Sequence, residues 1–332
     1  MTLDPDLAAF LELVESAALS GEKPAMYMLT PEQARFEYDT STQILDVPGP
    51  EMASVTEIAI PSRDGETIEA RLYQPLECVG TSAPKPVLLY FHGGGYCIGS
   101  LDSHDSLCRS LAALTPCCVL NVAYRLAPEY RFPTAVHDAQ DAYRWVLSSG
   151  SGFDLDTSRV AVAGDSAGGT LATGLTIAAR DEQWQQPVCQ VLLYPCTSAW
   201  QDDSSHQRFA QGYLLEEKTL QWMFGNYLRN EADRLDWRFA PLRAENLKNL
   251  APAFLILAEY DPLLEEGIAY GENLNAAGVS TRTKIYAGMI HDFARLGNIV
   301  DQALQVRKEI AGALAEAFYV SAARTDAQIF EV

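Results

Sequence analysis

The stretch Arg159-Val-Ala-Val-Ala-Gly-Asp-Ser-Ala-Gly-Gly-Thr170 decides the fold. Four small apolar residues follow Arg159, as in a buried strand, and the small residues after Gly164 favour a helix. Glycines on both sides of Ser166 allow a tight turn, which would raise the serine hydroxyl above the strand end at the start of the helix. A serine presented in this way is a candidate nucleophile. The alternative is a glycine-rich helix start that only packs closely or binds an anion.

A second glycine-rich segment, His92-Gly-Gly-Gly-Tyr96, follows directly on the apolar run Val87 to Phe91. Three glycines leave their backbone N–H groups unshielded, and acyl transfer needs such donors for the oxygen that becomes negative. The N–H group of Ala167, next to Ser166, would complete the set. A flexible glycine linker is the alternative, but linkers rarely sit between a buried strand and a helix of a compact sheet.

From about residue 85 onward, short β-rich runs alternate with amphipathic stretches, which predicts a mostly parallel sheet covered by helices. Two earlier runs, Val55 to Ile60 and Thr67 to Tyr73, are separated by Arg63-Asp64-Gly65 and predict a hairpin at the sheet edge. The other strands are expected at Val87 to Phe91, Cys118 to Tyr124, Arg159 to Ala163, Cys189 to Tyr194, Phe254 to Ala258 and Arg282 to Tyr286. Helices are expected at Ser103 to Leu114, Thr134 to Leu147, Ala167 to Ala179, Leu264 to Ala276 and Val300 to Phe318.

Two segments do not fit this alternation: the first 45 or so residues, and Ser198 to about Leu242. A connection as long as the second inside an α/β domain usually has a function. We expect the two segments to pack together as a cap, although each could instead cover the sheet independently. The expected division is residues 1–45 for the first part of the cap, 46–197 for the first part of the catalytic domain, 198–242 for the cap insertion and 243–332 for the rest of the catalytic domain.

In their order and spacing, three motifs resemble those of the hormone-sensitive-lipase-like (bacterial family IV) carboxylesterases of the α/β-hydrolase fold, in the Gly-Asp-Ser-Ala-Gly branch. The motifs are His92-Gly-Gly-Gly-Tyr96, Tyr124-Arg-Leu-Ala-Pro-Glu129 and Gly164-Asp-Ser-Ala-Gly-Gly169. The resemblance extends from about Val55 onward. It implies a mostly parallel central sheet with helices on both faces, a helical cap, hydrolysis of carboxylic esters and no cofactor. It also implies that Gly94, Gly95 and Ala167 donate to the oxyanion, and that His92 shapes the glycine loop.

In this fold the chain order is nucleophile, acid and base, with the last two on loops after late strands. Two histidines follow Ser166. His206 lies in the expected cap, before any plausible acid, whereas His291 follows the strand Arg282 to Tyr286. His291 is therefore the expected base, and the alternative is an ordinary surface histidine.

The expected acid is Asp261, because it comes right after the strand Phe254 to Ala258 and would point to the same sheet edge as the nucleophile. Glu259, Glu265 and Glu266 are competitors, and the last two fit better as solvated acids in the first turn of a helix.

Two further aspartates stand beside these residues. Asp292 follows His291 where the family commonly has glycine, and its carboxylate would either raise the pKa of the histidine or face solvent. Asp165 precedes Ser166 and is expected to anchor the turn by hydrogen bonds rather than to act as a second acid.

These residues predict a serine hydrolase that cleaves esters of short to medium acyl chain through Ser166, Asp261 and His291 and an acyl-enzyme. Four aromatic residues are candidates to line the substrate pocket, and each could equally belong to the core: Tyr96, Tyr194, Tyr213 and Trp222. An amidase or acyltransferase would use the same triad. A binding protein without turnover is the remaining alternative, which the presence of His291 disfavours.

The chain has 332 residues with 44 acidic side chains against 24 lysines and arginines, a formal charge of −20. This balance disfavours nucleic acids and acidic membrane surfaces as partners, and a small-molecule ester is the expected one. The N-terminus predicts no secretory signal, and no apolar run approaches the ~20 residues of a membrane span. Seven cysteines without a Cys-x-x-Cys pair predict reduced thiols, a cytoplasmic protein and no metal site. Dimers are frequent in the resembled family, so a homodimer is compatible with the sequence.

Overall fold

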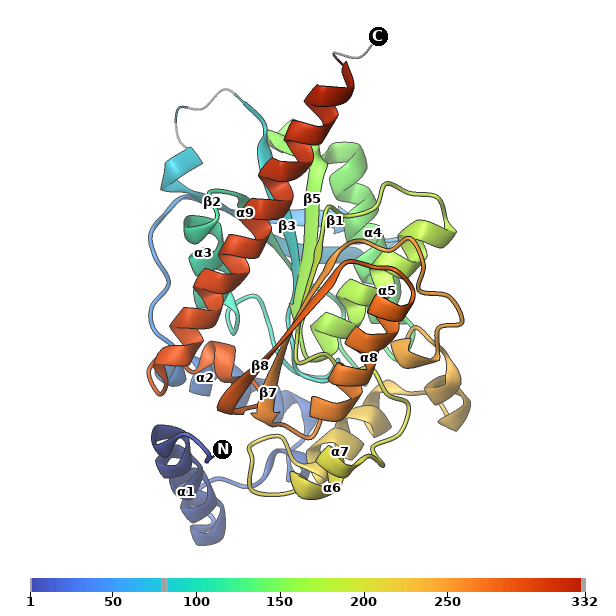
Figure 1. Cartoon of the computed structure of the whole chain (residues 1–332). Coiled ribbons are helices and arrows are strands. Elements are labelled where there is room, and N and C mark those ends of the chain that lie inside the picture. The colour runs from blue at the N-terminus through green and yellow to red at the C-terminus, as the bar shows by residue number, and fades with distance from the viewer. Residues whose placement is uncertain (1, 79, 81–82, 330–332) are drawn as a thin grey trace.

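Eight strands form one sheet in the computed structural model, which describes residues 2–78, 80 and 83–329 (Figure 1). Their order across the sheet is β1-β2-β4-β3-β5-β6-β7-β8. β1 and β2 form an antiparallel hairpin, β2 is also antiparallel to β4, and the remaining neighbours are parallel. The strands span Met52–Pro61, Thr67–Pro75, Lys85–Phe91, Cys118–Ala123, Leu155–Asp165, Gln190–Leu193, Ala253–Tyr260 and Thr281–Ile290 for β1 to β8.

Helices cover both faces of the sheet (Figure 1). One face carries α4 (Thr134–Ser149), α5 (Ala167–Asp181) and α8 (Leu264–Ala276), and the other carries α3 (Asp105–Leu114) and α9 (Asp301–Ile329). Successive side chains of a strand point to opposite faces, so a strand covered on both sides is apolar throughout. This explains why the central strands read as continuous apolar runs rather than as alternating ones.

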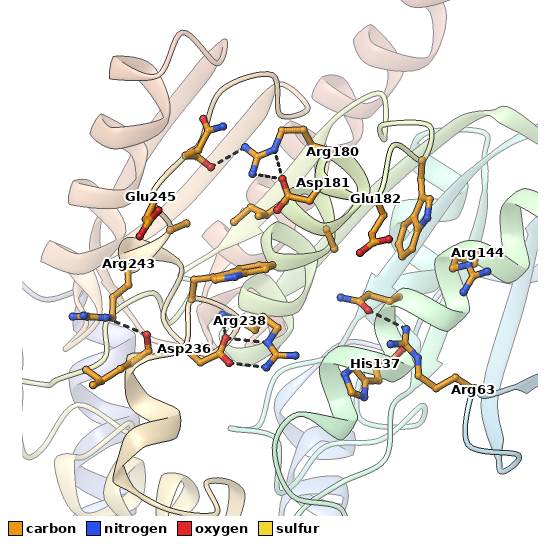
Figure 2. Close-up of a pocket in the computed structure, with 18 residues that line it drawn as sticks. Arg63, His137, Arg144, Arg180, Asp181, Glu182, Asp236, Arg238, Arg243 and Glu245 are labelled. Carbon is orange, nitrogen blue, oxygen red and sulfur yellow. Dashed lines mark hydrogen bonds and ion pairs between the residues drawn. The ribbon is translucent and has the colours of Figure 1, made fainter.

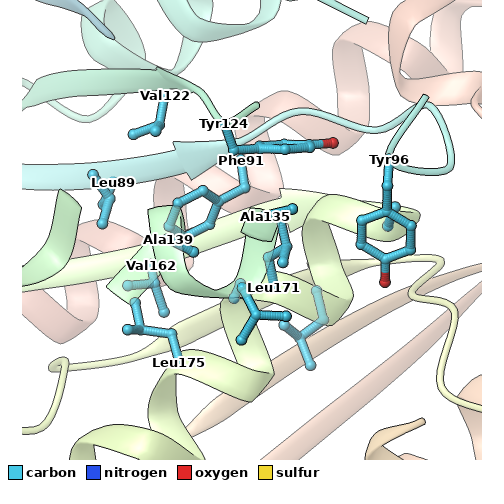
Figure 3. Packing of buried hydrophobic residues seen from close by; sticks show 14 of the residues in the cluster. Leu89, Phe91, Tyr96, Val122, Tyr124, Ala135, Ala139, Val162, Leu171 and Leu175 are labelled. Atoms are coloured by element: carbon cyan, nitrogen blue, oxygen red, sulfur yellow. The ribbon is translucent and has the colours of Figure 1, made fainter. Parts of the chain in front are cut away.

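The side chains of strand β3 contribute to two hydrophobic cores, one on each face of the sheet. Leu89 and Phe91 belong to the core under α4 and α5, whereas Leu88 and Tyr90 belong to the core under α3 and α9. Figure 3 shows the first core, where β3 side chains lie against alanines of α4 and leucines of α5. The predicted α/β fold with helices on both faces is thus confirmed.

The two segments outside the alternation contribute four α-helices, all at the end of the molecule where β7 and β8 terminate (Figure 1). The N-terminal segment holds α1 (Pro5–Ser20) and α2 (Pro31–Leu45), and the later one holds α6 (Ser204–Arg208) and α7 (Glu217–Tyr227). A capping box of Thr30 and Gln33 starts α2. The Lys218 ammonium of α7 lies 5.4 Å from the ring of Tyr27, in the turn before α2.

The expected strands are all present, but several of their ends differ. β5 begins at Leu155, which pairs with Lys85 of β3, and β8 continues to Ile290, which pairs with Tyr260 of β7. β6 is shorter than expected, because Cys189 and Tyr194 lie outside it, and Tyr194 takes a φ of 35°. The last helix continues to Ile329 instead of ending near Phe318. Within the described residues, no helix has both the length and the apolar character needed to cross a membrane.

Two glycines of α5 allow a test of how closely this helix approaches the sheet. A Cβ atom on Gly168 would lie 2.0 Å from the carbonyl oxygen of Phe91, whereas one on Gly174 would meet no heavy atom within 4 Å. We expect Gly168→Ala to lower the free energy of unfolding by about 1–3 kcal/mol through overpacking. We expect Gly174→Ala to be neutral or to stabilise by up to about 1 kcal/mol, because alanine favours the helix. Urea midpoints of the two variants test this, and equal effects would contradict the close approach.

Candidate active site

Ser166 occupies the single position between the end of β5 and the start of α5, with φ 53° and ψ −122°. Residues other than glycine rarely adopt such a conformation, which is typical of functional sites where the surroundings enforce it. The Ser166 N–H group donates to the carbonyl of Leu193 at 2.8 Å. A Cβ atom on Gly164 would lie 2.3 Å from the carbonyl of Gly168, so the strand and the helix can approach each other here only through glycine.

Asp261 and His291 are the first residues after β7 and β8, whose last paired residues are Tyr260 and Ile290. Because these strands are parallel neighbours, the two following side chains emerge together at one sheet edge. An Asp261 carboxylate oxygen lies 2.7 Å from Nδ1 of His291, and the other oxygen accepts the N–H group of Leu263 at 2.9 Å. Both residues are buried. This contact favours the tautomer with a proton on Nδ1, which leaves Nε2 free to accept one.

The pKa of His291 is raised above its ordinary value. Burial by itself lowers the pKa, but the charge of Asp261 and its hydrogen bond outweigh burial, and the charge of Asp292 adds to them. The Asp292 carboxylate does not simply face solvent, because Arg295 binds it at 2.9 and 2.5 Å and the Tyr38 hydroxyl donates to it at 3.3 Å. Asp292 has a φ of 69°, which explains why glycine suits this position and why aspartate can replace it.

The glycine loop has a left-handed backbone at Gly94 and Gly95, with φ of 109° and 57°. A Cβ atom on Gly95 would lie 2.1 Å from the sulfur of Met223, so α7 packs directly on this loop. Tyr96 stacks on Tyr227 of α7 with ring centroids 3.9 Å apart. The glycines therefore leave the backbone of this loop unshielded, and α7 packs directly against the loop.

Two buried side chains support the glycine loop from below. Nδ1 of His92 lies 2.8 Å from the carbonyl oxygen of Gly93, and burial lowers the pKa of this histidine to about 3, so it is neutral. Asp165 accepts a hydrogen bond from the Tyr90 hydroxyl at 2.7 Å and lies 3.2 Å from Nε2 of His104. A Cβ atom on Gly93 would lie 2.2 Å from the Asp165 carboxylate, which thus sits between the serine turn and the glycine loop.

A cavity of about 170 Å³ brings the predicted residues together. Ser166 and His291 line it with Gly94, Gly95 and Ala167, and Asp261 lies behind the histidine. The remaining lining residues are Met26, Tyr38, Ser41, Thr42, Leu45, Tyr96, Ile98, Asp165, Cys196, Leu214, Leu215, Thr219, Leu220, Met223, Phe224, Asp292, Arg295 and Leu296.

Comparisons with known proteins identify the family of the chain. A family model described as alpha/beta hydrolase fold matches residues 88–295. The chain is 43% identical over 305 residues to an ethyl acetate hydrolase of Pseudomonas putida, covering 91% of this chain and 95% of that protein. It is 40% identical over 257 residues to the carboxylic ester hydrolase LipN of Mycobacterium tuberculosis, covering 75% and 67%. The chain belongs to the α/β-hydrolase fold family.

A solved structure of an ester hydrolase from the metagenome of Lake Arreo superposes on this α/β hydrolase with a TM-score of 0.91. It shares 36% sequence identity and covers 96% of this chain and 99% of its own. The predicted membership of the hormone-sensitive-lipase-like group and the predicted ester hydrolysis are confirmed. The protein is a carboxylesterase, and its substrates are small-molecule esters.

Three of the four aromatic residues expected in the pocket of this α/β hydrolase lie elsewhere. Tyr96 lines the cavity, but Tyr194, Tyr213 and Trp222 do not. Tyr194 is buried, with its ring centroid 4.7 Å from that of His291. Tyr213 stacks on Tyr260 with ring centroids 5.7 Å apart, and Trp222 is partly buried and packs against the core under α4 and α5.

The residues that do form the walls of the esterase cavity show helical spacing. On α7 they are Thr219 and, at i, i+3 and i+4, Leu220, Met223 and Phe224. On α2 they are Tyr38, Ser41, Thr42 and Leu45, at i, i+3, i+4 and i+7. This spacing is visible in the sequence and could have identified one face of each helix.

A larger hollow of about 1010 Å³ lies between α4, the end of α5 and the segment before β7 (Figure 2). Several arginines line it, but Arg180 and Arg238 are paired with Asp181 and Asp236, which lie in the same hollow. The hollow contains none of the predicted catalytic residues. The residues predicted to be catalytic therefore meet only at the smaller of these two cavities.

His206 lies buried away from that cavity, between two carboxylates. Its Nδ1 lies 2.9 Å from Asp203 and its Nε2 lies 3.2 Å from Glu266. The two ring nitrogens lie next to different carboxylates, and a charged imidazolium would be attracted to both. The neighbouring Ser205 hydroxyl donates to the carbonyl of Pro262 at 2.7 Å, so α6 is attached to the loop that carries Asp261.

The pKa of His206 predicts a pH-dependent stability. Burial lowers this pKa, but the hydrogen bonds and charges of Asp203 and Glu266 outweigh burial and raise it to about 9. A raised pKa in the folded state contributes stability that is complete below the unfolded value of about 6.5 and is lost as the pH rises through about 9. We expect the difference in urea midpoint between the wild type and His206→Gln to be largest near pH 6 and to shrink toward pH 10. A constant difference over this range would contradict the charged bridge.

Proposed function

We propose that this carboxylesterase cleaves esters of short to medium acyl chain through a triad of Ser166, His291 and Asp261 and an acyl-enzyme intermediate. The observation that carries the proposal is the 2.7 Å contact between Asp261 and His291 next to a cavity that the strained Ser166 shares with the histidine. A nucleophile, a base and an orienting acid arranged in this way catalyse acyl transfer in proteins of several unrelated folds.

In the proposed reaction, Nε2 of His291 takes the Ser166 proton as the serine oxygen attacks the ester carbonyl. The N–H groups of Gly94, Gly95 and Ala167 stabilise the oxyanion of the tetrahedral intermediate. The bond to the alcohol oxygen then breaks, and His291 gives its proton to that oxygen. Water attacks the acyl-enzyme in the same manner, which releases the acid and restores the serine. Asp261 keeps its charge throughout and stabilises the imidazolium.

The preference for short acyl chains has two supports. The cavity of about 170 Å³ is smaller than the roughly 300–1,000 Å³ of common ligand pockets. The Pseudomonas putida relative is named for the hydrolysis of ethyl acetate, a two-carbon acyl ester.

We also propose that residues 1–45 and 198–242 act together as the cap. Both segments supply walls of the cavity, with Tyr38 on α2 and Leu220 on α7 as examples. The six cysteines other than Cys78 are buried and form no disulfide, which supports the proposal of a reducing, cytoplasmic compartment. A homodimer remains a proposal from the family resemblance, which light scattering of the purified protein would test.

Hydrolysis of p-nitrophenyl esters from acetate to dodecanoate tests the nucleophile and the acyl preference together. We expect rates to peak at short to medium chains, because longer chains exceed the cavity. Ser166→Ala should lower kcat by about 10⁴-fold or more. Ser158→Ala, an exposed serine on the opposite part of β5, serves as the matched control and should retain the activity. Equal rates in wild type and Ser166→Ala would overturn the proposal.

The pH dependence of kcat/KM tests the base. Because His291 must be unprotonated to accept a proton, the rate should rise with pH through a pKa above the ordinary histidine value of about 6.5. In Asp292→Asn the loss of a neighbouring negative charge should move this rise to lower pH. A flat profile from pH 5 to 8 in the wild type, or a shift to higher pH in the variant, would contradict the role of His291.

A further inference from the structure

Proton transfer decides which wall of the cavity meets the alcohol part of an ester. In the proposed mechanism His291 gives its proton to the leaving oxygen, so that oxygen must lie within hydrogen-bond reach of the histidine ring. The acyl part stays bonded to Ser166. The wall around His291 is thus assigned to the alcohol part, which leaves for the acyl part the wall of α7, whose Met223 packs on the glycine loop at Gly95.

The two walls differ in polarity. Around the histidine, α2 and the loop after β8 supply two leucines, Leu45 and Leu296, and five polar side chains: Tyr38, Ser41, Thr42, Asp292 and Arg295. Opposite them, residues 214–224 supply five apolar side chains and a single hydroxyl, that of Thr219. The cavity thus suits an ester with an apolar acyl part and a polar alcohol part.

In the wall around His291, which we call the polar wall, all N–H donors of Arg295 are used in hydrogen bonds. Its Nε and one Nη2 proton bond Asp292 at 2.9 and 2.5 Å, and the other Nη2 proton bonds the Tyr38 hydroxyl at 2.5 Å. The two Nη1 protons bond the Thr42 hydroxyl and the carbonyl of Ser103, both at 2.9 Å. Because a guanidinium has five N–H donors, none is left for a substrate. An anionic alcohol part would find no free cation in this wall.

The hydroxyl groups of the wall are also engaged as donors. Tyr38 donates to Asp292 at 3.3 Å, and the hydroxyls of Ser41 and Thr42 donate to the Tyr38 carbonyl at 3.0 Å each. Acceptor capacity remains on the Ser41 oxygen and on the Asp292 carboxylate, which has about four acceptor sites and uses three of them. Among these five side chains, the wall offers spare acceptors and no spare donor.

We propose that this enzyme prefers short-chain acyl esters of small hydroxylated alcohols, such as diol or triol monoesters, whose free hydroxyl donates to Ser41 or Asp292. A hydroxyl proton fits the spare acceptors, an alkyl group would leave them without a partner, and a carboxylate would be repelled by Asp292. The inference names the alcohol class for the site proposed above and rests on that proposed function.

Two esters of equal size test the proposal: 2-hydroxyethyl acetate and propyl acetate, which have the same number of non-hydrogen atoms. Each kcat/KM is divided by the rate constant of hydroxide-catalysed hydrolysis of the same ester, which removes intrinsic reactivity. We expect the corrected ratio to favour the hydroxylated ester by about tenfold or more, as for a hydrogen bond to a charged group. The acetyl ester of glycolate, with a carboxylate in place of the hydroxyl, should be slower than propyl acetate.

Variants show which side chains cause the preference for the hydroxylated ester. The measured quantity is again the corrected kcat/KM ratio of the two esters, because a general loss of activity lowers both rates and does not change their ratio. Ser41→Ala and Asp292→Asn should each lower the ratio at least about threefold. Leu220→Ala, which changes the opposite wall of the same cavity, should leave it within about twofold of the wild type.

The outcomes separate this inference from the proposed function. Hydrolysis of p-nitrophenyl acetate that depends on Ser166, combined with a ratio near or below one, would overturn the alcohol preference and leave the triad standing. A ratio above one that neither Ser41→Ala nor Asp292→Asn reduces would also overturn it. Absence of Ser166-dependent hydrolysis of any of these esters would overturn the triad and the inference together.

Discussion

The close approach of β5 and α5 at Gly164 and Gly168 is the constraint on which the rest of the site depends. Ser166 remains in a left-handed backbone conformation because the strand before it and the helix after it are both packed in place, with Phe91 of β3 touching the helix start. Any larger residue at either glycine would separate the two elements. The serine would then be free to relax to an ordinary backbone conformation and would leave the cavity that it lines together with the glycine loop and His291.

The parallel pairing of two strands positions the other site residues, just as close packing positions the serine. β7 and β8 end side by side, which delivers Asp261 and His291 to one place although thirty positions separate them. Charge is then balanced locally: Asp292, which adds a second negative charge next to His291, is bound by Arg295, and Arg295 in turn is held by α2 through Tyr38 and Thr42. The charged groups beside His291 therefore have fixed partners.

Short-range sequence signals predicted the sheet, the serine turn, the glycine loop and the loops that carry Asp261 and His291, because each depends on residues close together in the chain. The cavity walls could not be predicted in this way. Helical spacing shows that Tyr38, Ser41 and Thr42 share a face of α2, but not which distant surface that face will cover. The aromatic residues Tyr213 and Trp222 were expected in the pocket because of their type, whereas the structure uses the leucines and methionine beside them.

Some of the bonds that fix α2 join residues far apart in the chain. Tyr38 and Thr42 bond Arg295, more than 250 positions later, and Asp46 forms a buried ion pair with Arg307 of α9. During synthesis these partners appear long after α2. Closing loops of this length is entropically costly until the sheet has brought their ends together. The wall beside His291 can thus be completed only after Arg295 has been made, so a partly synthesised chain carries the serine turn without a finished cavity.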